Sequence, residues 1–400
     1  MRGWMWAAAL MVLGTVVTLA QPDPGATSLW VEPASQDFLR NPDLLERIRS
    51  GPHGYFRFIN IPFSREACRR IAALGPAPIL NLHGDAHLEQ YAVTDLGRGL
   101  TDFDDSSTGP GLIDILRFGV SLNLACRANG WDDQAEAMFT TFLDGYRDCL
   151  KDPDLEAAEP AVVARIRSGF SIDREAYFRW VESLMEPMRE GTMDSLKTAM
   201  RNYVETRLLE SPELGADFFR IERMGILKMG IGSALDLKFL VRIRGAAEDP
   251  LDDVVLEIKE VRDLSGIDCI QIGRTDDAFR ILVGQTRIAY QPFHHLGYFR
   301  FRGRTFWVHS WVDNYKEVKL ARSFQTPEEL RQVARDVGVQ LGKGHVKHIA
   351  APLDLQLRRA QLRVLSRNHA AILTMVRDLT GATVTAWTDF VAALPEAPPN

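Results

Sequence analysis

Apolar side chains recur every three or four positions through most of the first half of the chain, a spacing typical of amphipathic helices. The clearest case runs from Gly111 to Asn129, where Ile113, Leu116 and Val120 fall near one face of the predicted helix. Comparable patterns cover residues 41–50, 64–74, 132–150, 156–168, 173–189 and 193–209. Ser64 is the predicted N-cap of the helix over residues 64–74. The middle of the chain is therefore predicted to be a helical bundle.

Beyond residue 217 the period changes from helical to alternating, which predicts strands. Alternating segments cover residues 218–228, 235–244, 254–259, 298–302 and 305–311. Further helices are predicted over residues 276–283, 326–344, 355–379 and 384–394. We expect the last of these helices to return to the first, helix-rich part of the chain.

These patterns predict an α+β chain with a large helical lobe and a smaller β-rich lobe. The predicted segments are a signal peptide (residues 1–20), a flexible linker (21–34), a helical lobe (35–210), a β-rich lobe (211–312), C-terminal helices that pack on the helical lobe (313–395), and a tail (396–400).

The first twenty residues have a charged start at Arg2, an apolar run from Trp4 to Leu13, and small residues up to Ala20. This is the pattern of a signal peptide, so we expect cleavage after Ala20 and export to the periplasm or the medium. The alternative is an uncleaved segment that anchors the protein in the membrane.

Composition adds little to this assignment. The chain has 400 residues, a formal net charge of −6 and 25% charged side chains, so it lacks the basic footprint of a nucleic-acid-binding protein. The four cysteines are Cys68, Cys126, Cys149 and Cys269, without the paired spacing of a zinc site. Export permits disulfides, but Cys126 and Cys149 fall in apolar helical patterns and are predicted to be buried free thiols.

The candidate chemistry is concentrated between Ile79 and Asp105. An apolar run leads into His83-Gly84-Asp85-Ala86-His87, and a second cluster, Asp102-Phe103-Asp104-Asp105, follows about twenty positions later. An alternating segment and a Gly97-Arg98-Gly99 turn between them predict a hairpin, which would bring both clusters to the same end. A carboxylate after His-Gly can act as base for an attacking hydroxyl, and one in Asp-Phe-Asp can hold magnesium. Residues 105–110 are predicted to be a turn-rich loop.

A second motif lies in the β-rich part. The turn Gly230-Ile231-Gly232-Ser233 between two predicted strands lets backbone N–H groups approach a phosphate without obstruction from a Cβ atom. Lys259 lies one strand later and is predicted to face the sheet beneath that turn. This order of a Gly-rich loop and a strand lysine is how kinase-type sites hold nucleotide phosphates.

Together these motifs resemble the bacterial DUF2252 family. The resemblance rests on HGDAH, TDFDD, GPGLIDILRFGVSLNLA, GIGSALDLKFLVRI and LEIKEV, and it covers the chain from about Pro52 to His348. That family is itself similar to aminoglycoside phosphotransferases and protein kinases, which implies a two-lobed protein kinase-like fold. Because the catalytic loop here precedes the Gly-rich loop, such a fold would be circularly permuted, with the helix that ends near His345 docked beside the catalytic loop.

The resemblance also implies residue roles. Asp85 would be the catalytic base, and Asp102 the main magnesium ligand with assistance from Asp104 and Asp105. Gln90 stands where phosphotransferases have an asparagine as the second metal ligand, and its side chain is one methylene longer. Its neighbour Glu89 is an alternative ligand.

In the same resemblance Lys259 would contact the phosphates of ATP under a loop formed by Gly230, Gly232 and Ser233. Asp114 would brace the catalytic loop, and the nearby imidazoles of His83 and His87 would support it. The implied cofactors are Mg²⁺ and ATP, and the implied partners are a nucleotide and an unidentified small-molecule or protein substrate.

Some features depart from the phosphotransferase pattern. Thr101 stands where the family has asparagine, and Lys259 has no evident glutamate partner on a helix, with Asp276, Asp277 and Gln285 as the candidates. One alternative is therefore a kinase-like nucleotide- or ligand-binding protein without catalysis.

The other alternative is a metal-dependent hydrolase. His83, Asp85 and His87 alternate, so in an extended loop all three could face one ion, with Asp102 or Asp104 added.

Overall fold

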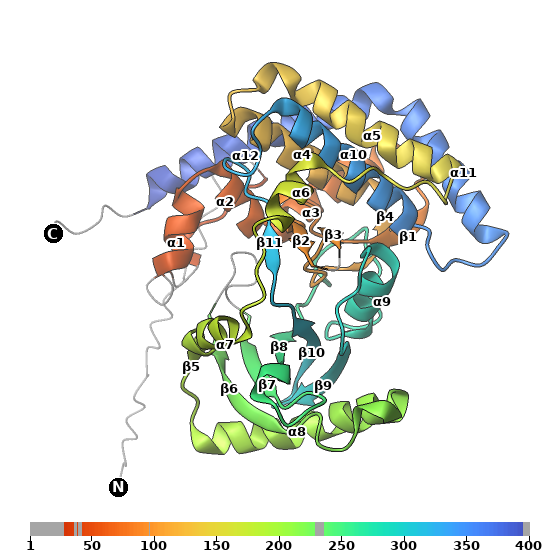
Figure 1. Ribbon diagram of the computed structural model, residues 1–400. Helices are drawn as coiled ribbons and strands as arrows, with labels where there is room; N and C mark the ends of the chain where they lie inside the picture. Colours follow the sequence, from red (N-terminus) through yellow and green to blue (C-terminus); the bar gives the residue numbers. More distant parts are fainter. Residues whose placement is uncertain (1–27, 36–37, 39–41, 96, 229–235, 395–400) are drawn as a thin grey trace, which may run out of the picture.

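The computed structural model describes residues 28–35, 38, 42–95, 97–228 and 236–394. In Figure 1 most helices gather in the upper part of the molecule, and a curved sheet lies in the lower part. The predicted signal peptide, residues 1–20, lies outside the described residues, so export remains a prediction. Within the described part of the chain, no helix combines the length and the apolar character that crossing a membrane requires.

The helical part is built around α4 (Leu112–Ala128), most of whose side chains are buried. The core around it is closed by α5 (Ala135–Lys151), α10 (Pro327–Gly344) and α12 (His369–Ala393). Helix α10 approaches α5 so closely that a Cβ atom at Gly338 would overlap the carbonyl oxygen of Phe142. C-terminal helices thus complete the core that the earlier helices begin.

Shorter elements surround this core. The helices are α1 (Pro42–Arg49), α2 (Pro52–Phe58), α3 (Asn60–Ala72), α6 (Ala161–Arg167) and α11 (Leu353–Arg367). Two small antiparallel sheets pair β1 (Ile79–Leu82) with β4 (Ser107–Pro110), and β2 (Tyr91–Thr94) with β3 (Arg98–Leu100) and β11 (Tyr315–Glu317). The hairpin of β2 and β3 confirms the predicted hairpin. The predicted loop at residues 105–110 was wrong, because its turn-like sequence is held as strand β4 by pairing with β1.

The larger sheet has six antiparallel strands in the order β5–β6–β7–β8–β10–β9. They are β5 (Met185–Glu186), β6 (Ile221–Leu227), β7 (Lys238–Ile243), β8 (Val254–Glu260), β10 (Arg304–Trp311) and β9 (Gly297–Phe301). The observed architecture is therefore mixed α+β, as predicted.

Two helices of the predicted bundle belong with this sheet. Leu196, Met200 and Tyr203 of α8 (Glu190–Glu210) share a core with the sheet, and α7 (Arg174–Ser183) packs beside it. The sheet-bearing part therefore begins before the predicted boundary at residue 210. Helical periodicity reveals an apolar face but not the element that covers it.

Two helix boundaries also differ from the predicted ones. Helix α3 begins at Asn60 directly after α2, so Ser64 is a buried residue inside the helix rather than its N-cap. The helix predicted over residues 355–379 is divided at Asn368, where α11 ends and α12 begins.

The connection between β8 and α9 (Phe279–Ile288) fastens the sheet to the helical part. A disulfide joins Cys68 of α3 to Cys269 of this connection, 201 residues later. Arg65 Nε also donates to the carbonyl of Gly266 at 2.6 Å, and Gln271 pairs with Thr108 of β4. Cys126 and Cys149 are buried free thiols, as predicted.

We predict that replacing both Cys68 and Cys269 by alanine lowers the free energy of unfolding by about 2–5 kcal/mol, because the disulfide restricts the unfolded chain. Denaturant unfolding of the oxidised protein measures this. Reductant should destabilise the wild type but leave the double variant unchanged; equal sensitivity in both proteins would contradict the prediction.

Candidate functional site

A cavity of about 210 Å³ lies between the helical part and the large sheet. Of the predicted site residues, its lining includes Asp85, His87, Gln90, Asp102, Asp104 and Lys259. His83 and Asp114 are buried behind it. The predicted phosphate loop with Gly230, Gly232 and Ser233 lies outside the described residues. The structure thus brings together the two motif clusters of the first 105 residues and the lysine from β8.

Asp114, near the start of α4, holds the backbone of the loop that carries Asp85. Its carboxylate accepts the N–H of His83 at 2.7 Å and the N–H of Gly84 at 2.9 Å, and His345 Nε2 lies 3.1 Å away. Burial alone would raise the pKa of Asp114, but the hydrogen bond and charge of His345 hold it below its usual range. Asp114 thus fixes the backbone of the loop that carries Asp85.

Glycine is required at position 84 for two reasons. Its φ of +84° is unfavourable for residues with a side chain, and a Cβ atom there would overlap the carbonyl of Asp105. The two motif loops therefore touch through their backbones at Gly84.

His83 links the two loops instead of facing the cavity. Its Nδ1 accepts the N–H of Asp85 at 3.3 Å, so Nε2 carries the proton and donates to the carbonyl of Thr101 at 2.9 Å. Both ring nitrogens are thereby engaged by backbone, and the alternating set His83, Asp85 and His87 does not converge on one point. Among the described residues, no group of three or more His, Cys, Asp or Glu side chains is placed to hold a metal.

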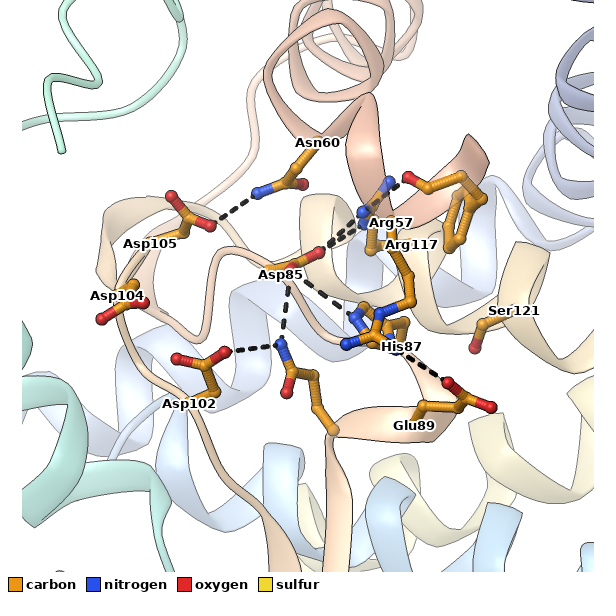
Figure 2. Close-up of polar contacts among 12 residues, drawn as sticks. Arg57, Asn60, Asp85, His87, Glu89, Asp102, Asp104, Asp105, Arg117 and Ser121 are labelled. Atoms are coloured by element: carbon orange, nitrogen blue, oxygen red, sulfur yellow. Dashed lines mark hydrogen bonds and ion pairs between the residues drawn. The ribbon is translucent and has the colours of Figure 1, made fainter. Parts of the chain in front are cut away.

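Asp85 is held by a fully buried arginine. Arg117 Nε donates to Asp85 Oδ1 at 2.9 Å, and Nη2 lies 2.7 Å from the same oxygen. Arg117 also donates to the carbonyl of Phe56 and lies over its ring at 3.8 Å. Figure 2 shows Asp85 between Arg117 and the acidic segment that carries Asp102 and Asp104. Burial outweighs the charge of Arg117 and raises the pKa of Asp85 to about 6.

His87 lies beside the other oxygen of Asp85. Its Nε2 is 3.6 Å from Asp85 Oδ2, and its buried Nδ1 has no hydrogen-bond partner. Burial holds the pKa of His87 well below its usual range, so the ring is neutral at physiological pH. It supports the site from the helical side without adding charge.

Gln90 connects Asp85 to the metal motif. Its Nε2 lies 3.4 Å from both Asp85 Oδ2 and Asp102 Oδ2. The hairpin of β2 and β3 sets this geometry, because Thr101, directly after β3, donates its backbone N–H to the carbonyl of Gln90, directly before β2, at 2.8 Å. Glu89 points elsewhere and pairs with Arg57 at 2.8 Å, so it does not take the place of Gln90.

Lys259 joins the sheet to the metal motif. Its Nζ lies 2.6 Å from Asp102 Oδ1 and 2.5 Å from Asp104 Oδ2. Trp307, the cross-strand neighbour of Lys259, donates its indole N–H to Asp104 Oδ1 at 2.8 Å. Asp102 has a φ of +60°, a conformation that is uncommon outside glycine and occurs at functional sites.

The pKa values of Asp102 and Asp104 are shifted in opposite directions. Burial would raise the pKa of Asp102, but the charge of Lys259 holds it well below its usual range. Burial and the neighbouring Asp102 raise the pKa of Asp104 to about 7. The pair therefore shares one proton near neutral pH while Lys259 stays charged.

The helix next to this cluster supplies an arginine that the sequence did not reveal. Arg280 of α9 donates to the carbonyls of Asp104 at 2.6 Å and Ser106 at 2.7 Å. An arginine on a short helix gives no sequence signal, because such side chains are usually solvated. The acidic partners of Lys259 are Asp102 and Asp104 in the loop after β3, whereas the candidate Asp276 accepts from Thr305.

Asp105, proposed as an assisting metal ligand, is engaged elsewhere. It accepts from Arg262 at 2.9 Å and from Asn60 at 3.0 Å. Arg262 also contacts Asp236 at 2.9 Å, so a salt-bridge network ties this loop to the strand that follows the Gly-rich segment.

The sheet adds a further acidic residue to the cavity. Glu257 lies two positions before Lys259 on β8, and its Oε2 accepts from Trp311 at 2.7 Å and lies 3.1 Å from His309. Lys259 and His309 lower the pKa of Glu257 to about 2 against the opposing effect of burial. The spacing of two along β8 placed it on the same face as Lys259 and was a readable signal.

The carboxylate oxygens of Asp102 and Asp104 are donors that suit a hard cation. Magnesium in proteins commonly binds one or two carboxylates and completes its shell with water and substrate phosphates. Asp102 and Asp104 meet that requirement, and Gln90 adds an amide oxygen if its side chain turns over. The Lys259 ammonium shows that this position already favours positive charge.

Comparison with sequence models of protein families finds a match over most of the chain. A sequence model of DUF2252, described as an uncharacterised protein conserved in bacteria, matches residues 44–187 and 173–393. No curated protein and no solved structure matches the chain. The matched stretches include both motif loops, β8 and α10.

We predict that Asp114→Ala lowers the free energy of unfolding by about 3–5 kcal/mol, because it strands buried backbone N–H groups and His345. Chemical denaturation measures the loss. Asp144→Ala, at a carboxylate that is 54% exposed, is the control and should change stability by less than about 0.5 kcal/mol. Similar losses in both variants would contradict this account of Asp114.

A pH titration tests the Asp102–Asp104 pair. Because the pKa of Asp104 is raised, its contribution to stability is complete below about pH 4 and is lost as the pH rises towards 7. In metal-free protein, the indole N–H resonance of Trp307 should therefore shift with an apparent pKa of about 7. Asp104→Asn should abolish the shift. A wild-type resonance that stays constant between about pH 5 and pH 9 would refute the assignment.

Proposed function

The chain belongs to the DUF2252 family, and we propose that it is a magnesium-dependent phosphotransferase of kinase-like fold that phosphorylates a hydroxyl group with ATP. The observation that carries the proposal is the contact of Lys259 with Asp102 and Asp104 across the cavity from Asp85. Lys259, the pair of Asp102 and Asp104, and Asp85 correspond in residue type to the lysine, the metal-binding aspartate and the catalytic aspartate of protein kinases, in that order.

The order of elements in the sheet supports a kinase-like lobe. The Gly-rich segment joins β6 to β7, Lys259 lies on the next strand β8, and helix α9 follows. In protein kinases a Gly-rich loop covers the phosphates, and the lysine lies on the third strand. Here the loop with Asp85 comes first in the chain. The end of α10 lies beside it, where Asn81 donates its N–H to the carbonyl of His345 at 3.1 Å, and this contact supports a circularly permuted arrangement.

Asp85 has the properties of a general base. A pKa of about 6 keeps it largely ionised at neutral pH while it can still hold a proton. Arg117 fixes Oδ1, and Oδ2, which lies 3.4 Å from Gln90 Nε2 and 3.6 Å from His87 Nε2, is the oxygen that would accept the proton of the acceptor hydroxyl. The hydroxyl oxygen then forms the new bond to the γ-phosphorus as the bond to the bridging oxygen breaks, and the nucleoside diphosphate leaves.

Positive charge stabilises the transferring group. When bound, magnesium would neutralise charge on the phosphates, with Asp102, Asp104 and the Gln90 amide oxygen as its ligands. Lys259 would donate hydrogen bonds to the phosphate oxygens while staying close to the two aspartates. Arg280 keeps the aspartate loop in place by binding its carbonyls.

A binding protein without catalysis is the second candidate. Gln90 favours it, because its amide nitrogen rather than its oxygen faces both carboxylates. Turnover and binding must therefore be measured separately.

We predict that ATP with magnesium raises the unfolding midpoint of the chain from Gln21 to Asn400, and that Asp102→Ala abolishes the rise. Differential scanning calorimetry with and without each ligand measures it, with Asp144→Ala as the control that keeps the rise. Absence of any shift with nucleotide, together with zinc or manganese in the purified protein, would favour the hydrolase instead.

Asp85→Asn separates catalysis from binding. It should keep the magnesium-dependent rise but slow phosphoryl transfer, or ATP hydrolysis in the absence of an acceptor, by about a hundred- to ten-thousandfold. Radiolabelled phosphate release measures the rate. A wild type that binds the nucleotide yet turns over no faster than Asp85→Asn would identify a binding protein.

A further inference from the structure

The aspartate loop, residues 102–106, is held from two sides by elements that a disulfide joins. Asn60, the first residue of α3, is buried, and its Nδ2 donates to Asp105 Oδ2 at 3.0 Å. Arg262, just after β8, donates to both oxygens of the same carboxylate at 3.0 Å and 2.9 Å. The bond between Cys68 on α3 and Cys269 on the connection after β8 closes this ring of contacts covalently.

Helix α3 relates the position of the disulfide to both motif loops. Asn60 and Cys68 lie eight residues apart on this one helix, which places them about 12 Å apart along its axis. Besides Asp105, Asn60 Nδ2 contacts the carbonyl of Gly84 at 3.1 Å, in the loop that carries Asp85. The helix therefore fixes the aspartate loop relative to the loop of the proposed catalytic base.

The connection between β8 and α9 encloses the aspartate loop from the sheet side. Arg280, near the start of α9, donates to the carbonyl of Asp104 at 2.6 Å and to that of Arg262 at 2.8 Å. Three apolar residues of the connection line a small cavity of about 10 Å³, which Gly84 and Asp105 also line. The connection thus packs directly on both motif loops.

The position of this connection depends on the disulfide. Residues 261–278, all of them described, form no helix or strand of their own, and long segments of this kind are mobile unless they are tied down. Arg65 Nε of α3 also donates to the carbonyl of Gly266 at 2.6 Å, but this bond is exposed to solvent, where such contacts contribute little. The covalent bond is therefore the stronger link between α3 and the connection.

We propose that the Cys68–Cys269 disulfide positions the metal-binding aspartate loop, and that its reduction weakens the binding of ATP with magnesium. This inference rests on the proposed function and adds control of the same site by thiol oxidation state. A dithiol reductant passes two electrons and two protons to the cysteine pair, so the S–S bond gives two thiols and the dithiol becomes a disulfide. The released connection then no longer fixes Arg262 against Asp105, and the two metal-binding aspartates lose their fixed geometry.

The test compares the oxidised and the dithiol-reduced wild type with the double variant Cys68→Ala, Cys269→Ala. Isothermal titration calorimetry on the mature chain is carried out below each unfolding midpoint, with circular dichroism to confirm folding. Reduction should weaken ATP with magnesium by about ten- to hundredfold, the range found when groups that orient metal ligands are lost. Adenosine, which has no phosphate to reach the metal, should change by less than about threefold. The double variant should bind like the reduced wild type and be insensitive to the reductant.

Leu365→Ala separates positioning of the loop from a general loss of stability. Leu365 is fully buried in α11 and does not line the cavity, so its truncation destabilises the fold away from the aspartate loop. With the disulfide intact, this variant should keep the wild-type affinity for ATP with magnesium. A loss of affinity equal to that of the double variant would overturn the inference.

The indole N–H of Trp307 gives a readout that needs no nucleotide. It donates to Asp104 Oδ1 at 2.8 Å, so its resonance reports the position of the aspartate loop. Reduction should shift or broaden this resonance in the wild type and leave it unchanged in the double variant.

An unchanged Trp307 resonance, or equal affinity of the oxidised and reduced wild type for ATP with magnesium, would overturn the inference and leave the proposed function intact. An oxidised wild type that binds no ATP with magnesium would instead remove the proposed function together with the inference.

Discussion

The contact of Lys259 with Asp102 and Asp104 is the constraint on which the site depends. It joins a strand of the large sheet to a loop of the helical part. Lys259 and Asp104 are buried, and the Asp102 side chain is 35% exposed. Buried charges cost free energy unless their geometry is good and their remaining hydrogen bonds are satisfied. Trp307 supplies one of those bonds, and Arg280 fixes the loop backbone. The disulfide and the segment that follows β8 hold the two parts together around this contact.

The same packing gives chemically similar carboxylates different properties. The charge of Lys259 keeps Asp102 ionised, and burial raises the pKa of Asp104 to about 7. The pKa of Asp85, which is bound by Arg117, is raised to about 6. Separating the pKa values of neighbouring acids is how one site provides both a cation-binding group and a base. Arg117 contributes by geometry as much as by charge, because it binds one oxygen of Asp85 while Gln90 and His87 lie beside the other.

Local sequence patterns predicted the parts of the site that depend on short-range structure. The hairpin after Gln90 was readable from its turn and alternation, and it brings Asp102 back to Asp85. The alternation of β8 indicated the face that carries Lys259. The partners of these residues were not readable. Arg117 and Arg280 lie on helices whose periodicity says nothing of a buried charge, and β4 forms only because β1 pairs with it. Such contacts are decided by elements distant in the chain.

The most direct measurement of the central claim is a crystal structure with Mn²⁺ in place of magnesium and a non-hydrolysable ATP analogue. We expect an anomalous manganese peak between Asp102 and the phosphates, with Lys259 on phosphate oxygens and the γ-phosphate facing Asp85. Manganese bound by His83 and His87 away from any nucleotide, or a cavity that takes up no nucleotide at saturating concentration, would contradict it.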